Sequence, residues 1–135
     1  MKLFIPPQFS KEYHYYSFYS SIIILCSSIY LYFMNCSLSF LVGVVGLLSI
    51  FHHSRSYEQK STDIFRCIDI FFANLLGLYI FYLYPNEETV FFLSLIGFLY
   101  LFIKKINSFQ YKSFLHSIMH FLLCFMIFFH LFYKN

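Results

Sequence analysis

The sequence predicts an all-α protein, a multi-pass membrane helix bundle with about five transmembrane helices. Two observations lead to this fold class: 60% of the 135 residues are hydrophobic and only 11% are charged, and the apolar residues fall in long runs separated by short polar stretches. A soluble domain has roughly a quarter of its residues charged, whereas a membrane helix needs about 20 mostly apolar residues. We therefore expect residues 1–135 to form a single transmembrane domain.

The first long apolar run contains two spans. Residues 15–51 include no Asp, Glu, Lys or Arg, and as one helix they would be about 55 Å long, against a bilayer core of about 30 Å. The run must therefore fold back on itself. Asn35 is the best turn residue because asparagine tolerates turn conformations, and the predicted spans are 15–34 and 37–53.

Polar segments delimit the remaining spans. These spans are predicted at 64–84, 89–103 and 113–133. Glu87 and Glu88 suit the N-terminus of the fourth helix, and Lys104 and Lys105 suit its C-terminus, because each charge opposes the helix dipole at that end.

The basic residues predict the orientation. With five spans, eight of the nine Lys and Arg residues fall on the side of the N-terminus, and only Lys134 falls on the other side. Because cytoplasmic loops are enriched in Lys and Arg, we expect the N-terminus to be cytoplasmic. The net charge of +3 is too small and too scattered for a nucleic-acid-binding surface. The expected partner is therefore a membrane lipid, and the organelle stays open.

Four ionisable residues fall inside the predicted spans at a similar depth: His53, Asp69, His116 and His120. Such side chains are costly in a membrane unless they find partners, so each is a functional candidate. His116 and His120 are spaced i, i+4, which places both imidazoles on one helix face, where they can share one ion. His53 would complete a set of three ligands and leave the fourth tetrahedral position for water, as in catalytic zinc sites. Asp69 would hold or deprotonate that water.

Taken singly, these residues have simpler interpretations. The histidine pair can hydrogen-bond to neighbouring side chains, Asp69 can pair with Arg66 at i, i+3, and His53 can lie among lipid headgroups. The convergence of all four residues at one depth favours a shared site. His130 lies near the far end of the last span and is not expected to join it.

Ser49-Ile-Phe-His-His53, Asp69 and His116-Ser-Ile-Met-His120 have the form S-x3-H, D and H-x3-H, each motif in a different span. This combination resembles the CREST superfamily of membrane hydrolases, which includes alkaline ceramidases, the progestin and adiponectin receptor (PAQR) proteins and GPI-remodelling proteins. The resemblance implies that the three histidines bind zinc and that Asp69 contacts the metal-bound water. It also implies that Ser49 supports the site from the face of its helix that carries the histidine ligand.

The chain offers two candidates for the ligand in span two and has fewer spans than that family. His52 is a second candidate for the ligand in span two, but His53 is preferred because it stands four residues after Ser49. The family has seven spans, so the resemblance covers the second, third and fifth of the spans predicted here. A homodimer would supply the missing walls of a lipid pocket.

Three functions remain open on the sequence alone. The leading hypothesis is a zinc-dependent intramembrane hydrolase of a ceramide-like lipid amide, with zinc-bound water as the nucleophile. The first alternative is a zinc-stabilised membrane protein with a binding or structural role and no turnover. The second is a small assembly partner of other membrane subunits, whose histidines bind no metal. Bound zinc and lipid hydrolysis together separate the three.

Overall fold

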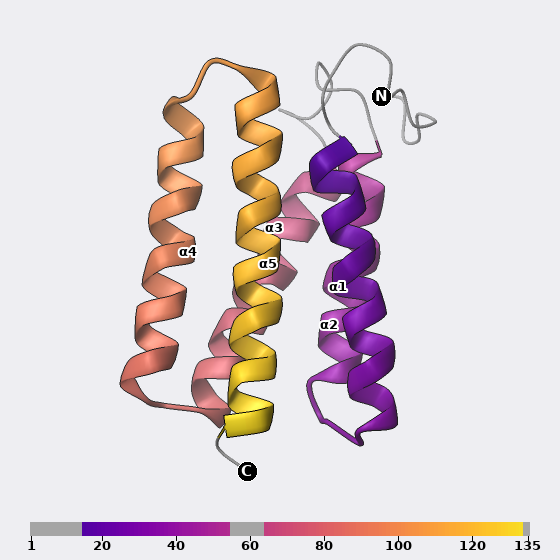
Figure 1. Ribbon diagram of the computed structural model, residues 1–135. Coiled ribbons are helices and arrows are strands. Elements are labelled where there is room, and N and C mark those ends of the chain that lie inside the picture. Colours follow the sequence, from indigo (N-terminus) through magenta and orange to yellow (C-terminus); the bar gives the residue numbers. More distant parts are fainter. Residues whose placement is uncertain (1–14, 55–63, 134–135) are drawn as a thin grey trace.

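The computed structural model describes residues 15–54 and 64–133, and these residues form five helices and no strand (Figure 1). The helices are α1 (Tyr15–Phe33), α2 (Ser39–His53), α3 (Ile64–Leu83), α4 (Glu87–Lys105) and α5 (Phe109–Tyr133). The predicted all-α fold class is therefore confirmed.

Within the described part of the chain, three helices are long and apolar enough to cross a membrane by length and composition: α1, α3 and α5. Helix α2 is apolar but has only 15 residues. Helix α4 carries two acidic residues in its first turn and two lysines in its last. The predicted orientation depends mainly on basic residues outside the described ranges, namely Lys2, Lys11, Arg55, Lys60 and Lys134.

Asn35 makes the turn between α1 and α2, as the sequence predicts. Its φ of 53° is in the left-handed region, which asparagine tolerates better than most residues. The Asn35 N–H donates to the Tyr32 carbonyl at 3.0 Å, and the Cys36 N–H donates to the Leu31 carbonyl at 2.9 Å. These two bonds form a Schellman motif, which satisfies carbonyl groups at the end of α1. The chain can therefore reverse within a few residues.

Two helices begin earlier than the predicted spans. Helix α4 starts at Glu87 rather than at residue 89, because the Asn86 side chain accepts a hydrogen bond from the Thr89 N–H at 2.9 Å and caps the helix there. Helix α5 starts at Phe109 rather than at residue 113, and its first turn is closed by the Lys112 N–H, which donates to the Ser108 carbonyl at 3.0 Å.

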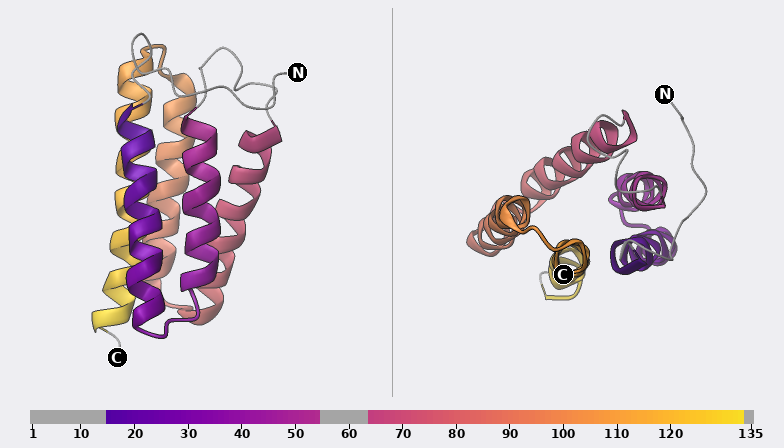
Figure 2. Two further views of the ribbon diagram at one scale, coloured as in Figure 1. Left: turned by 90° about the vertical axis from the view of Figure 1, so that its right-hand side faces the viewer. Right: turned by 90° about the horizontal axis from the view of Figure 1, so that it is seen from above.

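The helices are arranged so that α1 packs against α2 and α5, and α5 also packs against α4. Helix α3 packs mainly on α2 and meets α4 at only a few positions. Figures 1 and 2 show why: α3 crosses the bundle obliquely, lies close to α4 near the turn that joins them, and diverges from it toward the other end. We call the end at which α1, α3 and α5 begin the histidine end, because His53, His116 and His120 lie nearer to it.

The apolar core lies mostly in the opposite half of the bundle. Its buried members include Leu31, Leu38, Val42, Leu76, Ile80, Met126 and Ile127. These residues come from the late turns of α1, α3 and α5 and from the start of α2. The half near the histidine end is held together instead by buried serine, histidine and aspartate side chains.

Gly46 sets the close approach of α2 to α1. A Cβ atom at this position would lie 2.8 Å from the backbone nitrogen of Leu25 and 3.0 Å from its Cα. Backbone atoms at that distance cannot move aside without shifting a helix. Small residues of this kind let two membrane helices pack backbone to backbone.

We expect Gly46→Ala to lower the free energy of unfolding by about 1–3 kcal/mol, because the added methyl group overpacks the α1–α2 contact. Thermal unfolding in detergent measures the effect. Gly97→Ala in α4 is the matched control, since a Cβ there meets nothing within 4 Å and alanine is the better helix former. Equal stability of the two variants would contradict the tight α1–α2 contact.

Candidate metal centre

Helix α2 turns one buried face toward the bundle, and two histidines lie at its end. The buried residues of α2 are Val42, Val45, Gly46, Ser49, His52 and His53. Their spacing of three and four residues follows one side of a helix. His52 and His53 occupy adjacent positions on this face, which explains why both are buried.

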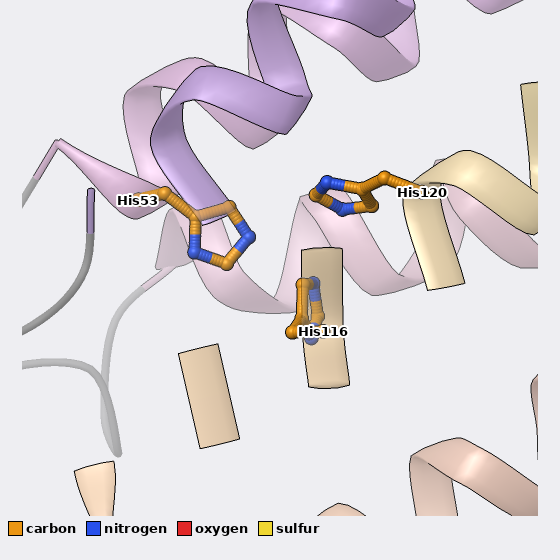
Figure 3. A group of neighbouring side chains, drawn as sticks. All are labelled: His53, His116 and His120. Carbon is orange, nitrogen blue, oxygen red and sulfur yellow. The ribbon is translucent and has the colours of Figure 1, made fainter. Parts of the chain in front are cut away.

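Helix α5 brings His116 and His120 to the same region from the other side. His120 is buried and His116 is partly buried, and their ring centroids are 4.7 Å apart. The His53 ring centroid lies 4.7 Å from that of His116 and 5.6 Å from that of His120. The structure therefore places the three histidines singled out from the sequence side by side (Figure 3).

The three imidazoles suit a zinc ion. Each offers one ring nitrogen, and these nitrogens lie within 4.8 Å of one another. A tetrahedral zinc ion with bonds of about 2.0–2.1 Å holds its ligand atoms about 3.3–3.4 Å apart. To bind one ion, the nitrogens would therefore have to move closer together by up to about 1.5 Å. Three protein ligands and one open position are typical of catalytic rather than structural zinc.

Ser20 of α1 is a hydrogen-bond partner of the His120 ring. Ser20 Oγ donates its one proton to the Ser17 carbonyl at 3.0 Å. Ser20 Oγ also lies 2.7 Å from His120 Nδ1. A hydroxyl has one proton to donate; with that proton on the Ser17 carbonyl, Ser20 accepts from the Nδ1–H of His120, and Nε2 is left to bind a metal ion. Such a hydrogen bond fixes the tautomer of metal-binding histidines.

Asp69 lies beside the three-histidine group and is held by Ser49. Ser49 Oγ donates to Asp69 Oδ1 at 2.6 Å, and both side chains are buried. Charge-assisted hydrogen bonds of this length are strong and fix the orientation of a carboxylate. Asp69 also forms a second group with His52 and His53, whose ligand atoms lie within 4.8 Å of one another. The structure thus groups His53 with the two α5 histidines, and His52 with His53 and Asp69.

His130 belongs to a different cluster at the opposite end of the bundle. Its Nε2 lies 2.8 Å from Thr89 Oγ1, which donates to Asn86 Oδ1 at 3.0 Å. The His130 ring also stacks on Tyr84, with centroids 4.7 Å apart and an interplanar angle of 7°. These contacts tie the end of α5 to the start of α4. They also explain why His130 is buried although it lies outside the candidate metal centre.

A cavity of about 340 Å³ adjoins the candidate metal centre, where His116 and His120 line it. At its polar end it is lined by Ser49, Asp69, His116 and His120. The rest of its lining comes from all five helices and is mainly apolar: Ile24, Val45, Ile70, Ala73, Asn74, Gly77, Leu78, Leu93, Ile96, Gly97, Tyr100, Met119 and Leu123. Ligand sites commonly combine an apolar wall with a few convergent polar groups.

The sequence motifs point to no residue of α1, although Ser20 contacts the centre directly. The available signal is the series of buried serines in an otherwise apolar helix: Ser17, Ser20, Ser21, Ser27 and Ser28. Polar side chains in a membrane helix generally face other helices rather than lipid. Ser17 also bonds Ser113 of α5 through its hydroxyl at 3.1 Å, and Ser27 bonds Cys124 of α5, whereas Ser28 lies beside Gly43 of α2.

Comparison with known proteins finds no matching family model, no matching curated protein and no matching solved structure. The function is therefore inferred from the side chains and their arrangement.

We expect Ser20→Ala to weaken zinc binding by about 10–100-fold, the usual cost of removing a hydrogen-bond partner from a ligating histidine. Competition with a fluorescent zinc chelator measures the affinity. Ser21→Ala is the matched control, because Ser21 is also buried and donates to the same Ser17 carbonyl, at 2.7 Å. Equal zinc affinity of the two variants would rule out an orienting role for Ser20.

Proposed function

We propose that the protein is a multi-pass membrane hydrolase that uses zinc to cleave a lipid amide of the ceramide type. The observation that carries the proposal is the position of His53, His116 and His120 beside the Ser49–Asp69 pair, at the inner end of an apolar cavity. An amide hydrolase of lipids needs these three parts together: an ion site, a proton acceptor and a place for a hydrocarbon chain.

The three histidines would hold the ion, with Ser20 orienting His120. A bound zinc ion supplies a water ligand with a pKa near 7 and polarises a carbonyl group. Asp69 accepts a proton from a water molecule as the oxygen of that water adds to the amide carbonyl carbon. Asp69 then returns the proton to the nitrogen as the C–N bond breaks, and the products are a fatty acid and an amine. Ser49 keeps the carboxylate of Asp69 oriented throughout.

The apolar lining of the cavity favours a lipid substrate over a water-soluble one. Beyond its polar end it is lined mainly by apolar side chains from α3, α4 and α5. An acyl chain from the bilayer finds apolar surroundings there like those that it leaves, whereas a polar solute would lose its hydrogen bonds to water. A chain lying along the cavity would place its amide carbonyl at the polar end, next to His116 and Asp69.

The test uses purified protein in phosphatidylcholine nanodiscs, supplied with zinc and a long-chain ceramide. Mass spectrometry of the released fatty acid is expected to show turnover. The His116→Ala/His120→Ala protein is the control and should release none. Absence of turnover by protein that carries stoichiometric zinc would overturn the proposal.

One observation favours a second function, a zinc-stabilised membrane protein without turnover. Helix α2 packs on α1 and α3, and α5 packs on α1 and α4, so the contacts of His53 with His116 and His120 join two helices that otherwise pack on other neighbours. An ion there would hold the histidine end together. That function predicts zinc and a lower unfolding temperature on chelation, with no fatty acid released.

A further inference from the structure

The cavity at the metal centre has a buried floor and an exposed rim. Its floor includes Ile24 of α1, Val45 of α2 and His120 of α5, which are all buried. Its exposed lining residues belong to α3 and α4 alone: Ala73, Asn74, Leu78 and Gly97. The cavity therefore reaches the surface of the bundle between these two helices.

The wall between α3 and α4 is thin for two reasons. The helices diverge from their common turn toward the histidine end, as both views in Figure 2 show, and they meet at only a few positions. In addition, Ala73 and Gly97 supply no long side chain to cover the gap, whereas at Gly77 the Leu93 side chain of α4 lies against α3. A Cβ atom added at Gly97 would meet nothing within 4 Å, so the space in front of this residue is open.

The surface around this opening is hydrocarbon-like. Residues 70–83 of α3 and 89–103 of α4 include no charged side chain. Neighbouring large side chains point outward, with Leu78 68%, Phe98 65% and Leu101 61% exposed. A surface of this kind faces lipid tails in a membrane protein. What reaches the opening from the side is therefore the acyl chain of a bilayer lipid rather than a solute in water.

We propose that the opening between α3 and α4 is a lateral portal, through which the acyl chain of a membrane lipid passes from the bilayer into the cavity. The chain slides between Ala73 and Gly97 and lies along the apolar lining, so that its polar end faces His116 and Asp69. The later hydrolysis of the lipid rests on the proposed function, whereas its entry into the cavity and its binding there do not.

A photoactivatable ceramide with a diazirine in the middle of its acyl chain tests the portal in phosphatidylcholine nanodiscs. Mass spectrometry of the labelled peptides is expected to place the label on cavity-lining residues of α3 and α4. Gly97→Phe fills the open space and should lower this labelling by about tenfold or more. Leu101→Phe is the matched control, because Leu101 lies on the same helix, is exposed and does not line the cavity; it should be labelled like the wild type.

The portal would be overturned if Gly97→Phe were labelled to the same extent as the wild type. It would also be overturned if the label were confined to outward-facing residues such as Phe98. The unfolding temperature of Gly97→Phe establishes that it is folded, and its zinc content is expected to match the wild type. The two proposals fail separately. If the wild-type protein has zinc and turnover but Gly97→Phe is labelled as strongly as the wild type, the portal alone is rejected. If Gly97→Phe lowers the labelling but the wild-type protein has no zinc or no turnover, the hydrolase alone is rejected.

Discussion

Purified wild-type protein is expected to carry about one zinc ion per chain, and the His116→Ala/His120→Ala variant is expected to carry none. Two of the three ligands are lost in the variant, and His53 alone cannot hold the ion against solvent and detergent buffers. Metal analysis by mass spectrometry, on protein purified without chelators, gives the stoichiometry. The expected difference is all or nothing, which makes this the clearest test of the metal centre.

His130→Ala is the matched control for that experiment. His130 is a buried histidine of the same helix, but it bonds Thr89 and stacks on Tyr84 at the other end of the bundle. Its variant should keep the zinc even if it is less stable. Wild-type protein without zinc would leave the histidine cluster as a set of packed polar side chains, and the assembly-partner interpretation would then be favoured.

Part of the helical fold follows from the sequence because two helices have local signals at an end. Asn35 allows the left-handed conformation that ends α1, and Asn86 caps α4. Length and apolar content then define the helices between these points. The spacing of His116 and His120 is also local, since two residues four apart on a helix must share a face whatever the helix packs against.

Which helices meet could not be read from the sequence in the same way. Apolar side chains cover most sides of these helices, so periodicity does not say which face packs on which neighbour. The contact of Ser20 with His120 and the opening in front of Gly97 depend on the crossing of whole helices. The same is true of the Ser49–Asp69 hydrogen bond, although the motif had already selected both residues. Local patterns therefore identify candidate residues, whereas their contacts come from packing.

Asp69→Asn is expected to keep its zinc and to lose ceramide hydrolysis by at least about a hundredfold, within the range usual for a general base. Asparagine has the shape of aspartate, and its Oδ1 can still accept the hydrogen bond that Ser49 donates. It cannot accept a proton from water, so the chemical step slows while the site stays assembled. The loss should fall on kcat, with KM for the long-chain lipid close to the wild-type value.

Ser49→Ala separates orientation from proton transfer at the same carboxylate. Without the 2.6 Å hydrogen bond, Asp69 keeps its charge but loses a contact that holds it in place. Hydrolysis should fall less than in Asp69→Asn, and zinc content should again be unchanged because neither residue is one of the three histidines. Wild-type kcat in Asp69→Asn protein would show that the proton goes to another group, and the Ser49–Asp69 pair would then be a packing feature of α2 and α3.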